Sequence, residues 1–218
     1  MLLYIIRHAD PDYGNDTITE FGWKEARALA DWLKDIPLDR IYTSPAGRAI
    51  DTAKPTLEIK GMTSEILPWA EESGDYMAAN DMSPETDCEF TFSVREGVHD
   101  FKDFRGPGRM ERINAAMTQA DQFLESCGYR RHGLFYDIVN PSEESIAVFC
   151  HGGFGTAWIG HLLGFSAGLM WPGITLNTSA VTTIVFFNDE QGYVRPKLRR
   201  LNEVAHIYKA GLKVNLGV

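Results

Sequence analysis

Short, continuous runs of hydrophobic residues alternate along this chain with amphipathic segments of helical period. The runs lie at residues 2–6 (LLYII), 146–150 (IAVFC) and 181–187 (VTTIVFF), and they are typical of strands that are covered on both faces. The amphipathic segments lie at residues 18–36 and 109–126, where apolar side chains recur every three or four positions. Strands that alternate with helices predict an α/β fold with a largely parallel sheet.

Two shorter strands and a helix are expected between these elements. One strand, the second along the chain after residues 2–6, is RIYTS at 40–44, and a helix should follow it through Lys54. Ser44 is placed to cap that helix, because Pro45 after it suits the first helical position. The other, the third strand along the chain, is expected at residues 64–69.

Two stretches depart from this alternation. The segment at about 73–108 is irregular and too long for a plain connection, so we expect an inserted cap or lid on a single domain that spans residues 1–218. Residues 145–188 contain no Asp, Glu, Lys or Arg, but they include His151, Pro172 and seven glycines. No apolar run there approaches the ~18 residues of a membrane span, so a buried strand, helix, loop and strand are expected.

Composition excludes several classes of protein. Hydrophobic residues make up 44% and charged residues 23% of the 218 residues, which excludes disordered and collagen-like chains. A chain of this length can bury enough surface to fold without a disulfide or a metal. The net charge of −9 offers no basic face to a nucleic acid, although local arginines can still bind a small phosphorylated molecule.

Cysteine usage and the N-terminal segment bear on location and partners. Cys88, Cys127 and Cys150 are odd in number and lack metal-ligand spacing, which indicates neither a disulfide framework nor a zinc site. The segment MLLYIIRHAD lacks the basic start of a signal peptide. We expect a cytoplasmic protein with no nucleic-acid or membrane partner, and a homodimer is compatible with the sequence.

Basic side chains follow three of the expected strands. Arg7 and His8 come directly after the first strand, and His151 follows the strand at 146–150. Arg48 lies in the first turns of the helix after the second strand, and Gly152 opens another helix, whose N-terminal N–H groups favour an anion. Ligands bind at the carboxyl ends of strands in open α/β sheets, so these residues are expected at one site.

Those residue types suit phosphoryl transfer. Guanidinium groups match phosphate oxygens, and a neutral imidazole is a good nucleophile near pH 7. A leaving alkoxide also needs a proton, which a carboxylic acid of raised pKa can supply. Glu71 and Glu72, after the third strand, are the best-placed acids. A lone histidine at a strand end is more often structural, so the joint placement of the basic residues carries this hypothesis.

The sequence resembles the histidine phosphatase superfamily, also called the phosphoglycerate-mutase-like family. The resemblance lies in RHA at 7–9, SPAGRAIDTA at 44–53, HGG at 151–153, and ITEFGWKEA at 18–26, where the family often has LTExGxxQA. It implies a three-layer α/β/α sandwich with a mostly parallel central sheet. It also implies that His8 accepts the phosphoryl group, that Arg7, Arg48 and His151 hold it, and that an acid after the third strand is the proton donor.

The sequence departs from the family pattern in two places. Ala9 and Asp10 stand where RHG, often followed by Glu, is usual, and the common donor motif LxExxxGxxEG is missing. Glu72 fits the usual spacing of the donor better than Glu71. If neither is the donor, the next candidates are Asp75 and Asp81, and Asn15 is a further candidate for phosphate contact along with Gly152.

Three functions remain open at this point. A phosphomonoester phosphatase is favoured over a phosphoglycerate mutase, because the mutase segments N-x-F-x-G-W and the arginine-rich stretch before HG are missing. A non-catalytic module that binds a phosphorylated ligand is the third alternative. None of the three requires a metal or a cofactor. Substrate selectivity is expected from residues that could contact the organic part of a small phosphorylated substrate or pack the insertion onto the core, namely Tyr76, Phe90, Phe92, His99, Phe101, Phe104 and Arg105.

Overall fold

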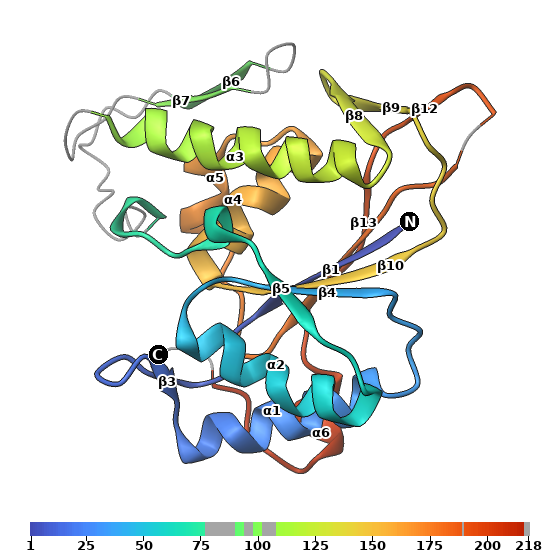
Figure 1. Ribbon diagram of the computed structural model, residues 1–218. Coiled ribbons are helices and arrows are strands. Elements are labelled where there is room, and N and C mark those ends of the chain that lie inside the picture. The colour runs from blue at the N-terminus through green and yellow to red at the C-terminus, as the bar shows by residue number, and fades with distance from the viewer. Residues whose placement is uncertain (77–89, 94–97, 102–107, 189, 216–218) are drawn as a thin grey trace.

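A six-stranded sheet forms the centre of the computed structural model, which describes residues 1–76, 90–93, 98–101, 108–188 and 190–215. Its strand order is β13-β11-β1-β10-β4-β5, and β11 alone runs against its neighbours (Figure 1). The expected mostly parallel α/β sheet is therefore confirmed. The six strands are β1 (Leu2–Arg7), β4 (Arg40–Thr43), β5 (Ser64–Ile66), β10 (Ser145–Cys150), β11 (Val181–Val185) and β13 (Lys197–Glu203).

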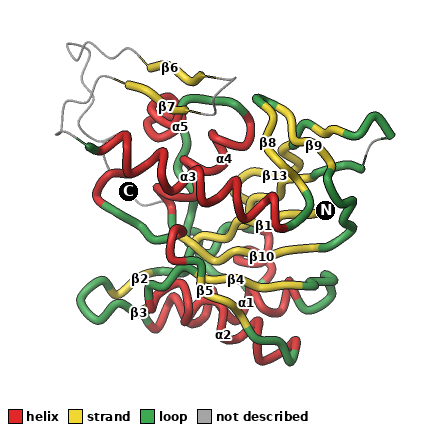
Figure 2. The backbone as a smooth tube through the Cα atoms, turned by 45° about the horizontal axis from the view of Figure 1, so that its top comes forward, coloured by secondary structure: helices red, strands yellow, loops and turns green. Residues whose placement is uncertain are grey.

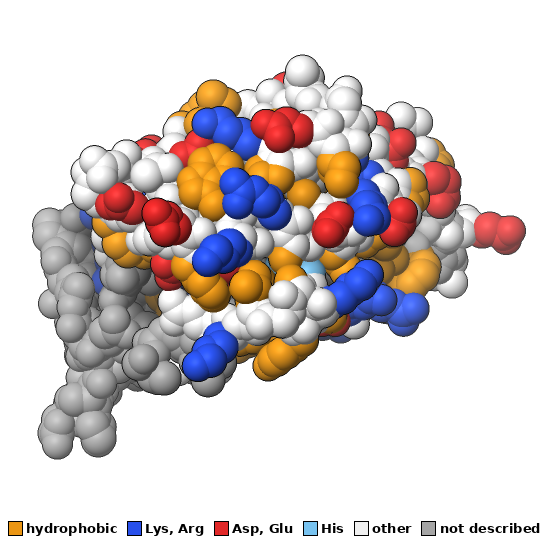
Figure 3. All heavy atoms as spheres, turned by 90° about the horizontal axis from the view of Figure 1, so that it is seen from below, with side chains coloured by type: hydrophobic (Ala, Val, Ile, Leu, Met, Phe, Trp, Pro, Cys, Tyr) orange, Lys and Arg blue, Asp and Glu red, His pale blue; other side chains and the backbone are white. Residues whose placement is uncertain are grey.

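Helices cover both faces of this sheet, as the three-layer expectation requires (Figures 1 and 2). One layer contains α1 (Glu20–Leu33), α2 (Gly47–Lys60) and α6 (Ala205–Lys209), and the other contains α3 (Arg109–Ser126), α4 (Gly152–Leu163) and α5 (Ala167–Gly173). On the outer face of the first layer, acidic and basic side chains are interspersed (Figure 3). In the part of the chain that is described, no helix is long and apolar enough to cross a membrane.

The central strand β1 contributes side chains to the hydrophobic cores on both faces of the sheet. Tyr4 and Ile6 pack with α1 and α2, whereas Leu3 and Ile5 pack with the core of α3 and α4. Successive side chains of a strand point to opposite faces. A strand that is buried on both faces therefore needs an unbroken apolar run, which is what residues 2–6 provide.

Among the described residues, three smaller sheets lie outside the central one. They are the hairpin of β2 (Pro11–Asp12) and β3 (Thr17–Ile18), the hairpin of β6 (Phe90–Ser93) and β7 (Val98–Phe101), and the sheet of β12 (Tyr193–Val194), β9 (Phe135–Ile138) and β8 (Tyr129–His132). Most of the expected lid at 73–108 lies outside the described residues. The third expected strand ends at Ile66, and a 3₁₀ turn (Pro68–Ala70) replaces its last part.

The expected N-cap at Ser44 is wrong. The helix α2 starts at Gly47, and it continues past Lys54 to Lys60. The hydroxyl of Ser44 pairs with Nε2 of His151 at 2.7 Å and accepts the N–H of Ala46 at 3.3 Å, one residue before the helix begins. A carboxylate from another loop takes over the capping role, because Asp16 Oδ2 accepts the N–H of Gly47 at 2.7 Å.

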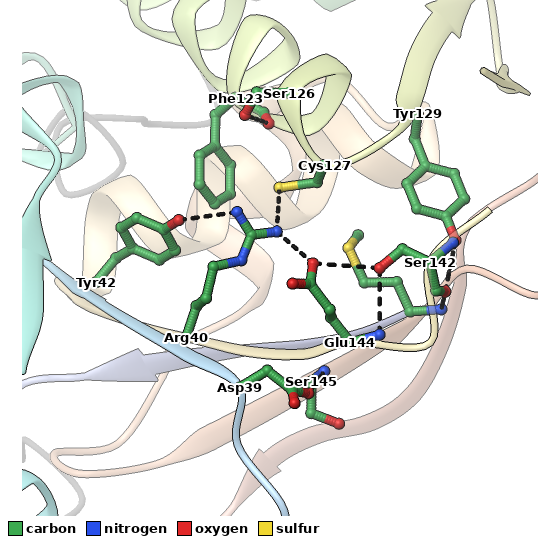
Figure 4. A network of polar contacts seen from close by, with 11 residues as sticks. Asp39, Arg40, Tyr42, Phe123, Ser126, Cys127, Tyr129, Ser142, Glu144 and Ser145 are labelled. Atoms are coloured by element: carbon green, nitrogen blue, oxygen red, sulfur yellow. Dashed lines mark hydrogen bonds and ion pairs between the residues drawn. The ribbon is translucent and has the colours of Figure 1, made fainter. Parts of the chain in front are cut away.

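A polar network joins the amino ends of β4 and β10 (Figure 4). Arg40 donates to Glu144 at 2.5 Å, to the Tyr42 hydroxyl at 3.1 Å and to the Cys127 sulfur at 3.4 Å. The Ser142 hydroxyl donates to the same Glu144 carboxylate at 3.2 Å. This network secures the end of the sheet opposite to the end where β1 and β10 deliver their basic residues.

A second cluster fixes α3 to the remainder of its layer. The carboxylate of Asp121 on α3 receives hydrogen bonds from Arg131 Nε at 2.6 Å and from the Tyr136 hydroxyl at 3.0 Å. The same carboxylate lies 2.9 Å from Nε2 of His161 on α4. Arg131, Tyr136 and His161 are all largely buried. Loss of the carboxylate would leave several buried donors without an acceptor.

We predict that Asp121→Ala lowers the free energy of unfolding by about 3 kcal/mol, because it leaves the Arg131 charge buried and unpaired. Glu125→Ala on the same helix is the matched control. Its ion pair with Arg130 is solvent-exposed on both sides, so the expected loss is below about 1 kcal/mol. Urea denaturation of both variants measures the difference. Equal losses in the two variants would contradict this account.

Candidate active site

A cavity of about 410 Å³ opens at the carboxyl end of β1, beside the amino end of α4. Four of the expected residues line it together, namely Arg7, His8, Arg48 and Glu72, and Gly152 joins them. The side chains come from β1, α2, the 3₁₀ turn region and α4. Elements far apart in sequence therefore meet where the parallel strands end, as the general rule for α/β sheets predicts.

The ring of His8 is held in one orientation. Its Nδ1 lies 2.8 Å from the carbonyl oxygen of Ala9. A carbonyl only accepts, so Nδ1 carries the proton and Nε2 keeps its lone pair. Burial, together with the charges of Arg7 and Arg48, lowers the pKa of His8 to about 4. The imidazole is therefore neutral near pH 7 and presents a free nucleophilic nitrogen.

The ring of His151 packs against the ring of His8. The two ring centroids are 5.2 Å apart, with the rings inclined at 65°. Nε2 of His151 pairs with Ser44, whereas its buried Nδ1 has no partner among the described residues. Burial and the neighbouring His8, Arg48 and Arg7 lower the pKa of His151 to about 2, so this ring is neutral as well. If the Ser44 hydroxyl donates its hydrogen bond to Nε2, the ring proton of His151 is on Nδ1, which is then a hydrogen-bond donor.

Each arginine is anchored by one terminal nitrogen. Arg7 donates through Nη1 to the carbonyl of Leu176, and Arg48 donates through Nη1 to Asp16 at 2.6 Å. The buried Nε atoms of both arginines lack a partner among the described residues. Both guanidinium groups line the cavity, and their positive charge favours an anion there. An oxyanion supplies several acceptor atoms and compensates the charge.

Glu72 reaches the start of α4. Its carboxylate accepts the N–H groups of Gly153 and Phe154, each at 3.0 Å. A Cβ on Gly153 would lie 2.9 Å from Glu72 Oε1 and 2.5 Å from Tyr76 Cβ, so only glycine permits this approach. Burial outweighs these hydrogen bonds and the nearby arginines, and it raises the pKa of Glu72. The group can therefore hold a proton at mildly acidic pH.

The other acids and Asn15 lie differently. Glu71 is exposed and does not line the cavity, and Asp75 forms an ion pair with Arg112 at 2.7 Å. Asn15 is exposed and donates to Asp12 at 2.8 Å, away from the cavity lining. Asp81 lies outside the described residues.

The residues expected to set substrate selectivity are only partly described. Tyr76 lines the cavity. The side chains of the others, and two of these residues entirely, lie outside the described part of the chain: Phe90, Phe92, His99, Phe101, Phe104 and Arg105.

Two carboxylates that support the site were missed from the sequence. Glu25 on α1 is fully buried, and it accepts the N–H of Asp10 and the hydroxyl of Thr178, each at 2.7 Å. It thus joins the loop after β1 to the loop before β11. Asp16, at φ +48°, binds both Gly47 N–H and Arg48, and so fixes the guanidinium. In the sequence, Glu25 lies on an amphipathic helix and Asp16 in a polar loop, where carboxylates are usually exposed to solvent. The only sequence signal for a role of either residue was that Glu25 stands where the family usually has Gln.

The charges that line the cavity suit an anion. Within the described residues, no group of three His, Cys, Asp or Glu side chains could hold a metal ion. The cavity lining combines two guanidinium groups, the neutral imidazole of His8 and one carboxyl group of raised pKa, and the buried, neutral ring of His151 packs against His8 without lining the cavity. Such a set can bind a phosphate, attack it with a nitrogen and donate a proton.

Solved structures with similar folds include several phosphatases. A phosphoserine phosphatase from Entamoeba histolytica, in complex with 3-phosphoglyceric acid, is 19% identical with a TM-score of 0.63, covering 94% of this chain and 98% of its own. A mycobacterial glucosyl-3-phosphoglycerate phosphatase is 18% identical with a TM-score of 0.61, covering 92% and 98%. A putative alpha-ribazole-5'-P phosphatase from Escherichia coli is 18% identical with a TM-score of 0.60, covering 94% and 98%.

These structural similarities show the fold of the chain. Its family is shown by a match to a sequence model of a protein family. Among curated proteins, no sequence matches this chain. The model of the histidine phosphatase superfamily (branch 1), however, matches residues 3–199. That match covers nearly the whole chain, including the loops that carry the cavity residues. The chain therefore belongs to the histidine phosphatase superfamily.

Proposed function

We propose that this protein is a phosphomonoester phosphatase that acts through a phosphohistidine on His8. The observation that carries the proposal is the single cavity in which the guanidinium groups of Arg7 and Arg48 meet the neutral imidazole of His8 and the carboxyl group of Glu72. A phosphate group bound by the two guanidinium groups would lie beside His8 Nε2.

In the first step, His8 Nε2 attacks phosphorus and the bond to the ester oxygen breaks. The arginines neutralise the charge on the three equatorial oxygens as the transition state forms. Glu72 gives its proton to the departing alkoxide, so the alcohol leaves neutral. The enzyme then holds phosphohistidine and a Glu72 carboxylate.

In the second step, water attacks phosphohistidine and the nitrogen–phosphorus bond breaks. The Glu72 carboxylate accepts a proton from that water, which restores the acid form. Inorganic phosphate then leaves, and His8 is again neutral with a free Nε2. A mutase would return the phosphoryl group to a sugar acid, and a binding module would stop before the first step.

A panel of phosphomonoesters separates these alternatives. We expect release of inorganic phosphate from several monoesters, and no net isomerisation of 3-phosphoglycerate when its bisphosphate is supplied. Isomerisation faster than phosphate release would favour the mutase. Phosphate binding with no turnover on any monoester would favour the binding module.

Replacement of the nucleophile should abolish turnover. In His8→Ala, no phosphohistidine can form, so we expect a loss of at least about 10³-fold in kcat, in line with removal of a covalent nucleophile. The wild type should yield an acid-labile, base-stable phosphoryl adduct on His8. His132→Ala is the control, since His132 is exposed and lies outside the cavity. An adduct on another residue would refute this assignment.

Replacement of the proton donor should affect substrates according to their leaving group. Glu72→Gln should lower kcat for alkyl phosphates by about 10²–10⁴-fold and for nitrophenyl phosphate much less, because a nitrophenolate leaves without a proton. Glu71→Gln, on the exposed neighbour, should change neither rate. A selective alkyl defect in Glu71→Gln would transfer the role to that residue.

The same two groups should set the pH dependence. The pKa of His8 is lowered to about 4, so activity should fall below that pH as the nucleophile becomes protonated. The pKa of Glu72 is raised, so alkyl phosphatase activity should fall at higher pH as the donor loses its proton. We expect an optimum on the acidic side of neutrality whose alkaline limb disappears in Glu72→Gln. Profiles of kcat from pH 3 to pH 9 would show this, and an unchanged alkaline limb would refute it.

Removal of metal should leave activity intact. The positive charge that a metal would supply comes from Arg7 and Arg48. We therefore expect full turnover after dialysis against excess EDTA. A loss that Mg²⁺ or Zn²⁺ restores would contradict the proposed mechanism.

A further inference from the structure

The cavity is much larger than a phosphate group. Its volume of about 410 Å³ lies in the range of sites that enclose a whole small organic molecule. The basic residues occupy only the part next to β1 and α4. The remaining walls therefore contact the alcohol part of the ester, and their chemistry indicates which alcohol fits.

One wall is an exposed aromatic ring. Tyr13 lies in the turn between β2 and β3, and 69% of its surface is exposed although it lines the cavity. The Arg48 guanidinium carbon lies 5.6 Å from the centroid of its ring, and the His8 ring lies 6.5 Å away, edge to face. A large aromatic surface beside the phosphate-holding groups is available for a ligand to cover.

The facing wall is also aromatic, and it is rigid. Trp171 on α5 is buried, and its indole N–H donates to the carbonyl of Gly153 at 3.1 Å. Tyr76 packs edge to face on it, with centroids 6.0 Å apart, and Ile174 and Leu176 extend this apolar surface. The β2–β3 hairpin and α5 lie on opposite sides of the central sheet (Figure 2), so the two walls flank the phosphate position.

The charges of the cavity walls also favour an uncharged alcohol part. In the described lining, the only guanidinium or ammonium groups are those of Arg7 and Arg48, and the only carboxylate is Glu72. The two arginines are engaged at the phosphate position. The Arg109 guanidinium lies over the Trp171 ring, 5.7 Å from its centroid, but Arg109 is buried and does not line the cavity. A second negative charge on the alcohol part, such as a carboxylate, would therefore face aromatic rings and hydroxyl groups.

We infer that this cavity selects phosphate monoesters whose alcohol carries an aromatic ring, held between Tyr13 and Trp171, over monoesters of small alcohols that carry a carboxylate. The inference rests on the proposed function, since it assigns the substrate class of the same site. It names Tyr13 as a residue that determines specificity through contact with the alcohol.

The test compares ligands that differ only in the ring. 3-Phenylpropylphosphonate and propylphosphonate cannot be hydrolysed, so calorimetry measures their binding without turnover. We expect the phenyl compound to bind about tenfold more tightly, from burial of its ring against two aromatic walls. In Tyr13→Ala, this preference should fall below about threefold, because one wall is lost. Tyr208→Ala is the matched control, since Tyr208 is 68% exposed on α6 and does not line the cavity.

Turnover gives a second, independent readout. 2-Phenylethyl phosphate, propyl phosphate and O-phosphoserine all release alkoxides, so differences in kcat/KM report binding of the alcohol more than its acidity. We expect the phenylethyl ester to be preferred in the wild type and in Tyr208→Ala, and that preference to shrink in Tyr13→Ala. Preference for phosphoserine, or equal binding of both phosphonates, would overturn the inference.

The two proposals fail in different ways. Turnover of every ester without preference for the ring overturns the substrate class and leaves the phosphatase standing. Preferential binding of the phenyl phosphonate without turnover of any ester supports the substrate class and overturns the phosphatase. A Trp171→Ala variant is not required, so a folding defect at that buried residue does not affect the result.

Discussion

Two guanidinium groups and two imidazole rings lie together at one buried site, and burial, together with the arginine charges, governs the protonation state of the histidines. Arginine remains charged at any physiological pH. The histidines, in contrast, can lose their charge. Burial together with the arginine charges lowers the pKa of His8 to about 4 and that of His151 to about 2, so both rings are neutral near pH 7. Neutral rings keep the lone pair that attack on phosphorus requires. The same excess of positive charge attracts a phosphate dianion, so one electrostatic condition supports both nucleophile and binding.

The acceptors around the site orient this charge without cancelling it. Asp16 and the Leu176 carbonyl each take one terminal nitrogen of an arginine, which leaves the Nε atoms unpaired. Glu25 binds backbone and hydroxyl donors behind the loop that carries His8, and Glu72 binds the start of α4. Each carboxylate is thus occupied by fixed donors of the protein. Such preorganised groups need no rearrangement as charge moves in a transition state.

Sequence reasoning succeeded where one physical constraint had a single solution. The run LLYII can be buried only as a strand between two cores, and polar residues at its end had to emerge at the sheet's carboxyl edge. That logic placed Arg7 and His8 at the cavity.

It failed where the partner of a side chain lies far along the chain. Ser44 looked like an N-cap because its true partner, His151, is 107 positions away. Glu25 looked like a surface acid of an amphipathic helix, since nothing local reveals Asp10 and Thr178 around it. Strands were expected in LFYDIV (134–139) and in residues 193–198, but not that parts of both would form a separate sheet with β8, because β12 has only two residues and depends on its pairing with β9.

The position of β1 in the sheet has a consequence for how the chain is made. Both neighbours of β1 in the sheet, β10 and β11, begin more than 140 residues after it along the chain. Until they have been synthesised, the apolar strand β1 lacks its hydrogen-bonding partners, which is a condition under which nascent chains aggregate. β1 can enter the sheet fully only after residue 185 has been synthesised. The loop that carries His8 is therefore assembled long after its own residues have been synthesised.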